Sequence, residues 1–494
     1  MLRDQIIHLN LVEILNKLYS NSNTPADLSI HISDNIHHIY DELITANYTL
    51  LISHRSEIEE FLYSKYHVIK NIDLANSDNF TFLTLLLDIC ERFNLTTLFQ
   101  RFYKLVQRAS FKTHLRLEAS AIYIIGINSL PEQITAADAF FNKLNEAYTF
   151  EEDGADRILA IVTNFYAQAV LNYGQFNQPG LQKLKETINS NRQIFTFIDC
   201  DLLDKVLLVN TVEYLSAFKE IHSILDAYLH RVNVIPISNT NLIESGTDYC
   251  NFLNLCTMDI YAIRQIAVGQ YRLVGGQAVF NSLGKGVEVL HEEKQLYQYL
   301  YSYGKMHFAK IQAALQHLPT QCTEKPMDLI DWGCGQALAT ISVLHFANTK
   351  ITAENITLVE PSEIALKRGS LHVKKFSASA SVLTINKTID MLLPSDFNPP
   401  TKNIYLHLFS NILDVENFSI TKLIALIKSS FRGINYFIVV SPCMSSQTRR
   451  NRLSHFVNSF ASRDGFSLYK SVIKQKGEWK NEWTMILYVF KVEL

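Results

Sequence analysis

Two glycines in the C-terminal third of the chain have the setting of a ligand-binding turn. Gly333 and Gly335 come directly after the mostly apolar run DLIDW, and Gln336 alone separates them from the apolar segment ALATISVLHF. Glycine adopts unusual φ and ψ values and has no Cβ atom, so a ligand can approach the backbone closely. The helix expected after the loop offers unpaired N–H groups at its start. The spacing therefore predicts a binding loop, with a tight turn that binds nothing as the alternative.

A carboxylate at the end of the next apolar run is the second group with a chemical role. Glu360 follows NITLV and lies 25 residues beyond Gly335. A carboxylate at a strand end can accept two hydrogen bonds from the hydroxyls of a ribose. Together with the glycine loop it favours a ligand that carries a ribose, and an ordinary strand-end charge is the alternative.

The elements that must position these residues alternate between short β-type runs and helical stretches from residue 327 onward. The sequence predicts strands in MDLIDWG, NITLVEPS, SVLTINKTI, KNIYLHLFSNIL and NYFIVVSP, with helical segments between most of them. FSLYKSVIKQ and TMILYVFKVEL then predict an antiparallel strand pair. Such a series gives a doubly wound, mainly parallel, Rossmann-like sheet whose ligand lies at the carboxyl ends of the strands.

The loop from Asp331 to Ala337 reads D-x-G-x-G-x-A and resembles motif I of class I S-adenosylmethionine (SAM)-dependent methyltransferases. The family usually has glycine where Ala337 stands. The resemblance implies that the loop packs against the methionyl part of SAM and that Asp331 holds its ammonium group. A zwitterionic amino acid tail needs both a carboxylate and exposed amides, so this assignment makes chemical sense. Leu338 occupies the place of the last glycine of a dinucleotide fingerprint, which disfavours a dinucleotide enzyme.

The resemblance extends to residues after the later strands. It implies a cofactor site that includes Cys334 in the loop, Glu360 and Pro361 after the second strand, and Asp390 near the end of the third, where the adenine amino group is contacted. After the fourth strand it implies a pocket around the sulfonium and the methyl acceptor, with the candidates Ser410, Asn411 and Asp414. For Asp390 the alternative is a surface loop, and for the last three it is turn formation. No metal ligands are predicted, because the seven cysteines are scattered without any C-x-x-C spacing.

The helix expected just before motif I, YLYSYGKMHFAKIQAAL, is unusually rich in tyrosine. Its spacing puts Tyr299, Tyr303 and Lys310 on one stripe and His307 on a neighbouring one. We expect Tyr303 and His307 to face the cofactor. This helix is faintly similar to the one before motif I in mitochondrial small-ribosomal-subunit assembly methyltransferase-like proteins, although the cysteine cluster of that family is absent. A plain core helix is the alternative.

The N-terminal half has a different texture, with apolar residues at three- and four-residue steps up to about residue 230. Two helix pairs, roughly 116–149 and 155–190, repeat at about 40 residues, which suits an α-solenoid or an irregular helical domain. The chain is therefore predicted to be α + α/β. We expect a helical interaction domain over 1–245, a helical connector over 246–320 and a methyltransferase-like domain over 321–494.

Composition narrows the class of protein further. The chain has 48% apolar and 19% charged residues and a formal charge of −3, which describe a globular protein with no global attraction to nucleic acid. No run of 18 apolar residues predicts a transmembrane helix, so no membrane partner is expected, and a reducing cytoplasm is the expected compartment.

The methyl acceptor is less defined than the cofactor. SNIL after the fourth strand lacks the prolines of the enzymes that methylate exocyclic amines of nucleic acids. Cys443 follows Pro442, as in RNA cytosine-5 enzymes, but an inert thiol is the favoured interpretation. A basic cluster could bind phosphates or merely be a solvated helix face; its members are Arg449, Arg450, Arg452, Lys374 and Lys375.

Two functions follow from these observations. The first is a SAM-dependent methyltransferase that acts on a macromolecule, RNA or protein, recruited by the helical region. The second is an interaction protein whose methyltransferase-like domain binds SAM without turnover, with the helical region as a scaffold.

Overall fold

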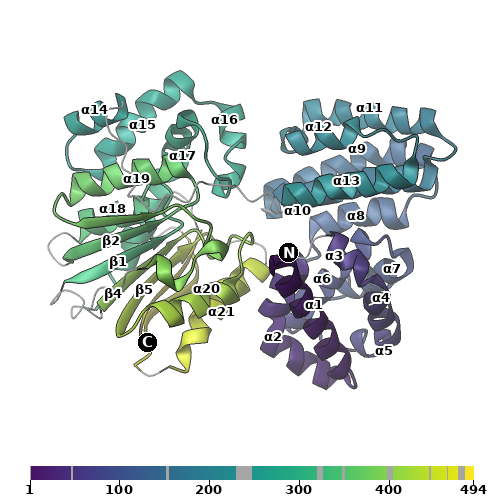
Figure 1. The fold of residues 1–494 in the computed structure, drawn as a ribbon, viewed down its shortest axis with the longest axis horizontal. Helices are drawn as coiled ribbons and strands as arrows, with labels where there is room; N and C mark the ends of the chain where they lie inside the picture. Colours follow the sequence, from purple (N-terminus) through teal and green to yellow (C-terminus); the bar gives the residue numbers. More distant parts are fainter. Residues whose placement is uncertain are drawn as a thin grey trace. The chain divides into compact units, whose positions relative to one another are not determined.

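The computed structural model describes residues 2–45, 48–151, 155–229, 248–319, 326–347, 351–397, 404–443, 447–463, 465–476 and 484–494. These residues fall into two compact units, one chiefly from residues 1–232 and the other chiefly from residues 233–494 (Figure 1). The boundary predicted at residue 245 lies outside the described residues, so the division into three domains stays a prediction. None of the described helices combines the length and the apolar character needed to cross a bilayer.

The first unit is helical throughout the part that the structure describes, and polar caps and prolines mark where several of its helices begin. The Ser129 side chain accepts a hydrogen bond from the Glu132 N–H at the start of α9, with a proline in the first turn. Asn177 does the same for α11. The helices are α1 (Leu2–Ser20), α2 (Pro25–Thr45), α3 (Tyr48–Ser53), α4 (Arg55–Ser64), α5 (Tyr66–Ile69), α6 (Ser77–Arg92), α7 (Thr96–Val106), α8 (Leu115–Ile125), α9 (Leu130–Glu146), the π-helical turn η1 (Ala147–Glu151), α10 (Ala155–Tyr173), α11 (Gln178–Ile194), α12 (Asp201–Leu208) and α13 (Tyr214–Leu229).

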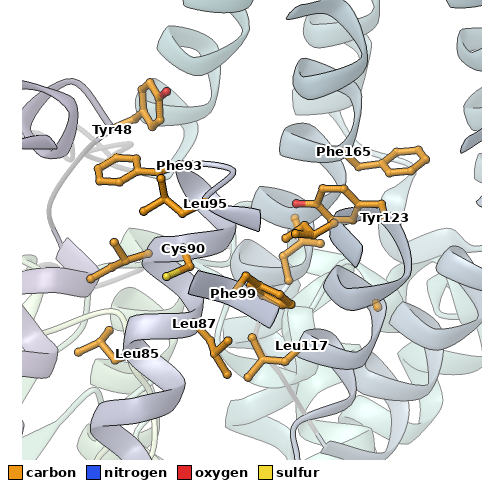
Figure 2. Packing of buried hydrophobic residues seen from close by; sticks show 14 of the residues in the cluster. Tyr48, Leu85, Leu87, Cys90, Phe93, Leu95, Phe99, Leu117, Tyr123 and Phe165 are labelled. Carbon is orange, nitrogen blue, oxygen red and sulfur yellow. The ribbon is translucent and has the colours of Figure 1, made fainter. Parts of the chain in front are cut away.

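The two predicted helix pairs correspond to α8 with α9 and to α10 with α11. They do not pack in the same way, because α8 packs chiefly on α9 whereas α10 packs chiefly on α13. The 40-residue repeat therefore stays a prediction. One continuous apolar core joins these helices, and Figure 2 shows Leu87, Phe99 and Leu117 from α6, α7 and α8 within it.

The second unit is built on a seven-stranded sheet with the order β3-β2-β1-β4-β5-β7-β6. The first five strands are parallel, and β7 is antiparallel to both of its neighbours. The predicted doubly wound sheet with a C-terminal antiparallel pair is confirmed. The strands are β1 (Met327–Trp332), β2 (Ala353–Val359), β3 (Ser381–Ile385), β4 (Ile404–Ser410), β5 (Ile434–Ser441), β6 (Ser467–Lys476) and β7 (Thr484–Glu493).

Alternation along the strands separates two apolar cores, one on each face of the sheet. In β1, Leu329 belongs to the core that includes residues of α18 (Leu338–Phe346) and α19 (Glu363–Phe376). Its neighbour Ile330 belongs to the opposite core, with residues of α20 (Ile420–Ser430) and α21 (Gln447–Ala461). Figure 1 shows these helix pairs covering the two faces.

The helices that precede the sheet share the first of these cores. They are α14 (Asp248–Leu255), α15 (Ile260–Val274), the short α16 (Gln277–Asn281) and α17 (Glu293–Leu315). Phe308 and Ile311 of α17 pack in the same cluster as Ile438 of β5. The long helix α17 therefore lies against the sheet, where it can contribute side chains to the carboxyl ends of the strands.

Candidate functional site

The register of the parallel strands aligns four polar or glycine positions at one edge of the sheet. Trp332 pairs with Val359 and with Phe409, and Val359 pairs with Ile385. The positions that follow these strand residues are Gly333, Glu360, Asn386 and Ser410, which therefore lie in one row. The carboxyl edge of a doubly wound sheet is where such folds bind their ligands.

The glycine loop between β1 and α18 has the conformation that its sequence predicts. Gly333 has φ +63°, Gly335 has φ +52° and Ala337 has φ +58°, all in the left-handed region. A Cβ atom built on Gly333 would lie 2.8 Å from Ile412, whereas one built on Gly335 would have no heavy atom within 4 Å. Gly335 thus borders open space that a ligand could enter, and this cradle fits the amino acid end of SAM.

Asp331 lies beneath this loop and is buried, with 1% of its surface exposed. Its Oδ2 atom accepts hydrogen bonds from the Thr340 N–H, at 3.2 Å, and from the Thr340 hydroxyl, at 2.7 Å. Burial raises the pKa of Asp331 to about 7, against the opposing effect of the Thr340 hydrogen bonds. The carboxyl group is therefore poised to ionise when a cationic group binds next to it.

Glu360 and the glycine loop are in direct contact. The Glu360 Oε2 atom accepts a hydrogen bond from the Gly335 N–H at 2.9 Å, and Oε1 accepts one from the Ser362 N–H at 2.9 Å. Desolvation raises the pKa of Glu360 to about 7, although part of the side chain remains exposed. Each carboxylate oxygen still has a lone pair for a ligand hydroxyl. The two strand-end features that the sequence singles out are therefore brought together.

The position after β3 differs from the one expected. Asp390 lies in the 3₁₀ turn η5 (Ile389–Met391), where its carboxylate accepts a hydrogen bond from the Ser419 N–H at 3.0 Å. Asn386 comes directly after the strand instead, with 3% of its surface exposed. Its Nδ2 donates to the carbonyl oxygens of Glu360 and Pro361, both at 2.9 Å, while its buried Oδ1 has no partner among the described residues. Asn386 was missed because the strand ends at Ile385, earlier than its apolar run suggests.

Helix α17 brings its own polar side chains to the end of β4. The Tyr299 hydroxyl lies 3.1 Å from His307 Nε2, and His307 Nδ1 lies 2.9 Å from the Ser410 hydroxyl. One turn further on, Lys310 Nζ donates to Asn411 Oδ1 at 2.8 Å. Burial, with the nearby Lys310 cation, lowers the pKa of His307 to about 3, so its imidazole is neutral.

A small cavity lies where these groups meet the glycine loop. Its volume is about 20 Å³, which holds about one water molecule. The cavity brings together predicted residues from the loop, from α17 and from β4. Its lining consists of Tyr299, His307, Asp331, Gly333, Cys334, Gly335, Leu338, Ala339 and Ser410.

Six predicted residues do not line this cavity: Glu360, Asp390 and Asn411, described above, and Tyr303, Asp414 and Pro361. The ring centroids of Tyr303 and Phe280 are 6.1 Å apart, so Tyr303 packs toward α16. Tyr299 lines the cavity, where Tyr303 was expected. Asp414 is buried and accepts a hydrogen bond from the Ser441 hydroxyl at 2.7 Å. Pro361 contributes its carbonyl oxygen to Asn386. The rotation of α17 depends on packing, so the sequence stripe alone could not distinguish the tyrosines.

The glycine loop is also tied to elements that sequence patterns did not connect with it. Gln336 Nε2 donates to the Leu296 carbonyl oxygen of α17 at 3.0 Å. The Gln336 carbonyl oxygen accepts a hydrogen bond from His372 Nδ1 at 2.8 Å, and His372 Nε2 is bonded to the Tyr249 hydroxyl of α14. These buried contacts fix the loop between α14, α17 and α19.

Two arginines of the basic cluster near the sheet make internal contacts. Arg452 is buried and donates hydrogen bonds to the carbonyl oxygens of Leu413, Val415 and Phe418. Arg449 is 9% exposed, and its guanidinium lies 3.8 Å from the Glu416 carboxylate. These two arginines therefore have neither of the predicted roles, phosphate binding at an exposed rim or a place on a solvated helix face. No metal-binding group of three ligands occurs in the described part of the chain.

Comparisons with known proteins assign no family to this chain, so the interpretation of the site rests on its geometry. No family model and no curated protein matches the chain. Among solved structures, the chain is similar to a protein named as a candidate class I SAM-dependent methyltransferase from Listeria monocytogenes, with 14% identity, 67% of this chain and 88% of that chain covered, and a TM-score of 0.30. It is also similar to an rRNA methylase from Streptococcus thermophilus, with 11% identity, 37% and 97% coverage, and a TM-score of 0.27. It is similar as well to the plantazolicin methyltransferase in complex with S-adenosylhomocysteine (SAH), with 10% identity, 47% of this chain and 100% of that chain covered, and a TM-score of 0.28. At these TM-scores the fold rests on the strand order of the sheet itself.

Proposed function

We propose that the second unit binds SAM and transfers its methyl group to a macromolecule that the helical unit recruits. The observation that carries this proposal is the hydrogen bond between Glu360 and the Gly335 N–H, beside the open cradle at Gly335 and above the buried Asp331. Two carboxyl groups and a left-handed glycine loop meet at the carboxyl edge of a doubly wound sheet, where a ribose and an amino acid tail would both find partners.

Each half of the cofactor has a residue suited to it. Asp331 would hold the ammonium group, and Glu360 would accept hydrogen bonds from the ribose hydroxyls. Asn386, with its buried and unpartnered Oδ1, would accept one from the amino group of adenine. The cofactor would supply a methyl group already activated by its sulfonium, so the chain need only orient the acceptor and take a proton where one is released.

The size of the helical unit supports a macromolecular acceptor. More than 200 residues form one helical core that adds no side chain to the described cavity, which is more than recognition of a small metabolite needs. The end of β4 lacks the prolines of the amine-methylating nucleic acid enzymes, and Ser410 and Asn411 are bonded to His307 and Lys310 instead. RNA and protein are the two candidate acceptors, and the test below distinguishes between them.

A second function is favoured by one observation, the small volume of the cavity. A site that holds about one water molecule suits a protein that has kept the fold as an interaction module without turnover. This function predicts SAM binding without transfer, or no binding at all.

The test uses the full chain, SAM labelled in its methyl group, and total RNA and total protein as separate acceptors. The proposal predicts label in one of the two fractions, and about tenfold less label with Glu360→Gln at a SAM concentration below saturation. Glu363→Gln is the matched control, because Glu363 is a partly exposed residue of α19 paired with Lys367. Label in neither fraction, from a protein that binds SAH, would contradict transfer and support the second function.

A further inference from the structure

The cavity at the glycine loop is too small for the ligand that its walls suit. Its volume is about 20 Å³, which holds about one water molecule and not the amino acid end of SAM, and neither Glu360 nor Asn386 lines it. The space at Gly335 is open, so the restriction comes from the opposite wall. Tyr299 and His307 of α17 form that wall together with Ser410 of β4.

A chain of hydrogen bonds holds these side chains across the cavity. It runs from the Tyr299 hydroxyl to His307, over 3.1 Å, and from His307 to the Ser410 hydroxyl, over 2.9 Å. His307 has 5% of its surface exposed, whereas Tyr299 at the outer end of the chain is partly exposed, so water can reach the Tyr299 hydroxyl. The link spans from α17 to the end of β4 and forms one wall of the cavity.

The hydrogen bonds from Tyr299 through His307 to Ser410 can be broken at a low cost in free energy. The three side chains are neutral, because burial keeps the imidazole of His307 uncharged. Hydrogen bonds between neutral groups contribute little net free energy, since water or a ligand can replace them. The ring of Tyr299 also lies next to that of Tyr303, at 5.1 Å between centroids.

We propose that Tyr299 and His307 form a gate, so that the ligand-free protein rests closed and SAM enters only after the Tyr299–His307–Ser410 chain has opened. The gate rests on the proposed function of the site, because SAM is the ligand that it admits. The closed state lowers the apparent affinity by the fraction of molecules that are open. Weakening the closed state therefore increases both the association rate and the affinity, while the dissociation rate stays the same.

The test measures SAH binding to the full chain by calorimetry and by stopped-flow fluorescence. Tyr299→Phe keeps the ring and removes the hydroxyl that bonds to His307. Losing one such hydrogen bond should raise the association rate and the affinity about fivefold. Ser410→Ala, which removes the other end of the chain, should act in the same direction. Tyr301→Phe is the matched control on the same helix, because Tyr301 stacks on Tyr271 away from the cavity, and it should leave both values unchanged.

Two results would overturn the gate, and they are distinct. If Tyr299→Phe binds SAH more weakly through faster dissociation, Tyr299 is a ligand contact, and the cofactor site stands without a gate. If no variant and no wild-type protein binds SAH, while all have the circular dichroism of a folded chain, the proposed function fails and the gate with it. Binding by Tyr299→Phe but not by the wild-type protein would support a gate that is closed in nearly all molecules.

Discussion

At the scale of single residues, glycine is needed at position 335 for two reasons, its left-handed backbone and the space that a ligand would occupy. Its φ of +52° is strained for other residues, and a Cβ atom there would project into open space. We predict that Gly335→Ala lowers the free energy of unfolding by about 1 kcal/mol. It should also weaken SAH binding at least about tenfold, because the new methyl group enters the cradle.

The matched substitution is Gly269→Ala in the exposed interior of α15. Nothing lies within 4 Å of a Cβ atom there, and the helical backbone favours alanine, so the free energy of unfolding should rise by about 0.5 to 1 kcal/mol. Urea denaturation and calorimetry measure both effects. Equal SAH affinity in Gly335→Ala and wild-type protein would contradict the position of the ligand at the loop.

Asp331 should make the binding of SAM at the proposed site depend on pH. Its pKa of about 7 in the free protein means that it is mostly protonated at pH 6 and mostly ionised at pH 8. The groups that face it are Thr340, which stabilises the carboxylate, and Glu360, which disfavours it. Because the ammonium group needs the carboxylate, we predict that SAM affinity rises about tenfold from pH 6 to pH 8. Calorimetry at both values tests this, and Asp331→Asn should flatten the difference; an affinity that falls with pH would contradict the role of Asp331.

At the scale of elements, Arg452 of α21 holds the segment that follows β4. Its guanidinium satisfies three carbonyl oxygens, those of Leu413, Val415 and Phe418. Arg452→Ala leaves buried acceptors without partners, so we predict a loss of about 3 kcal/mol in the free energy of unfolding of the second unit. Arg463→Ala, at an exposed arginine after the same helix, should change it by less than about 0.5 kcal/mol. A stable Arg452→Ala variant that fails to bind RNA would instead identify Arg452 as an RNA contact.

The elements also show what could be predicted from the sequence. The alternation of strands and helices follows from local apolar periodicity and from glycine and proline breaks, and the sheet agrees with it. The third strand ends at Ile385 because it pairs there with Val359, and pairing is not local. The polar residue that directly follows the third strand is therefore Asn386 and not the expected Asp390. The choice between Tyr299 and Tyr303 likewise depended on how α17 packs against α16.

At the scale of the whole molecule, buried titratable groups set a stability optimum in pH. Burial lowers the pKa of five histidines to about 3 or 4, and their contribution is lost as pH falls below about 6.5, where the unfolded chain takes up protons. Burial raises the pKa of three carboxyl groups to about 7, and their contribution is lost as pH rises from about 4.5 through 7. The histidines are His222, His307, His372, His407 and His455, and the carboxyl groups are Glu91, Asp331 and Glu360.

These opposing effects predict the highest melting temperature near pH 6.5. Below that value the five histidines outweigh the three carboxyl groups, so stability falls toward pH 5. Above it the carboxyl groups act alone, and stability falls slightly toward pH 8. Scanning calorimetry of the full chain across this range tests the prediction, with Glu91→Gln as a variant that should lose part of the alkaline decline. A melting temperature that rises steadily from pH 5 to pH 8 would contradict it.

The proposed function requires a cofactor site formed by the glycine loop and Glu360. Its most direct test is calorimetric titration of the wild-type protein, Glu360→Gln and Glu363→Gln with SAH. We predict binding by the wild-type protein and by Glu363→Gln, with an affinity at least about tenfold lower in Glu360→Gln. No binding by folded wild-type protein, or equal binding by all three proteins, would contradict the site.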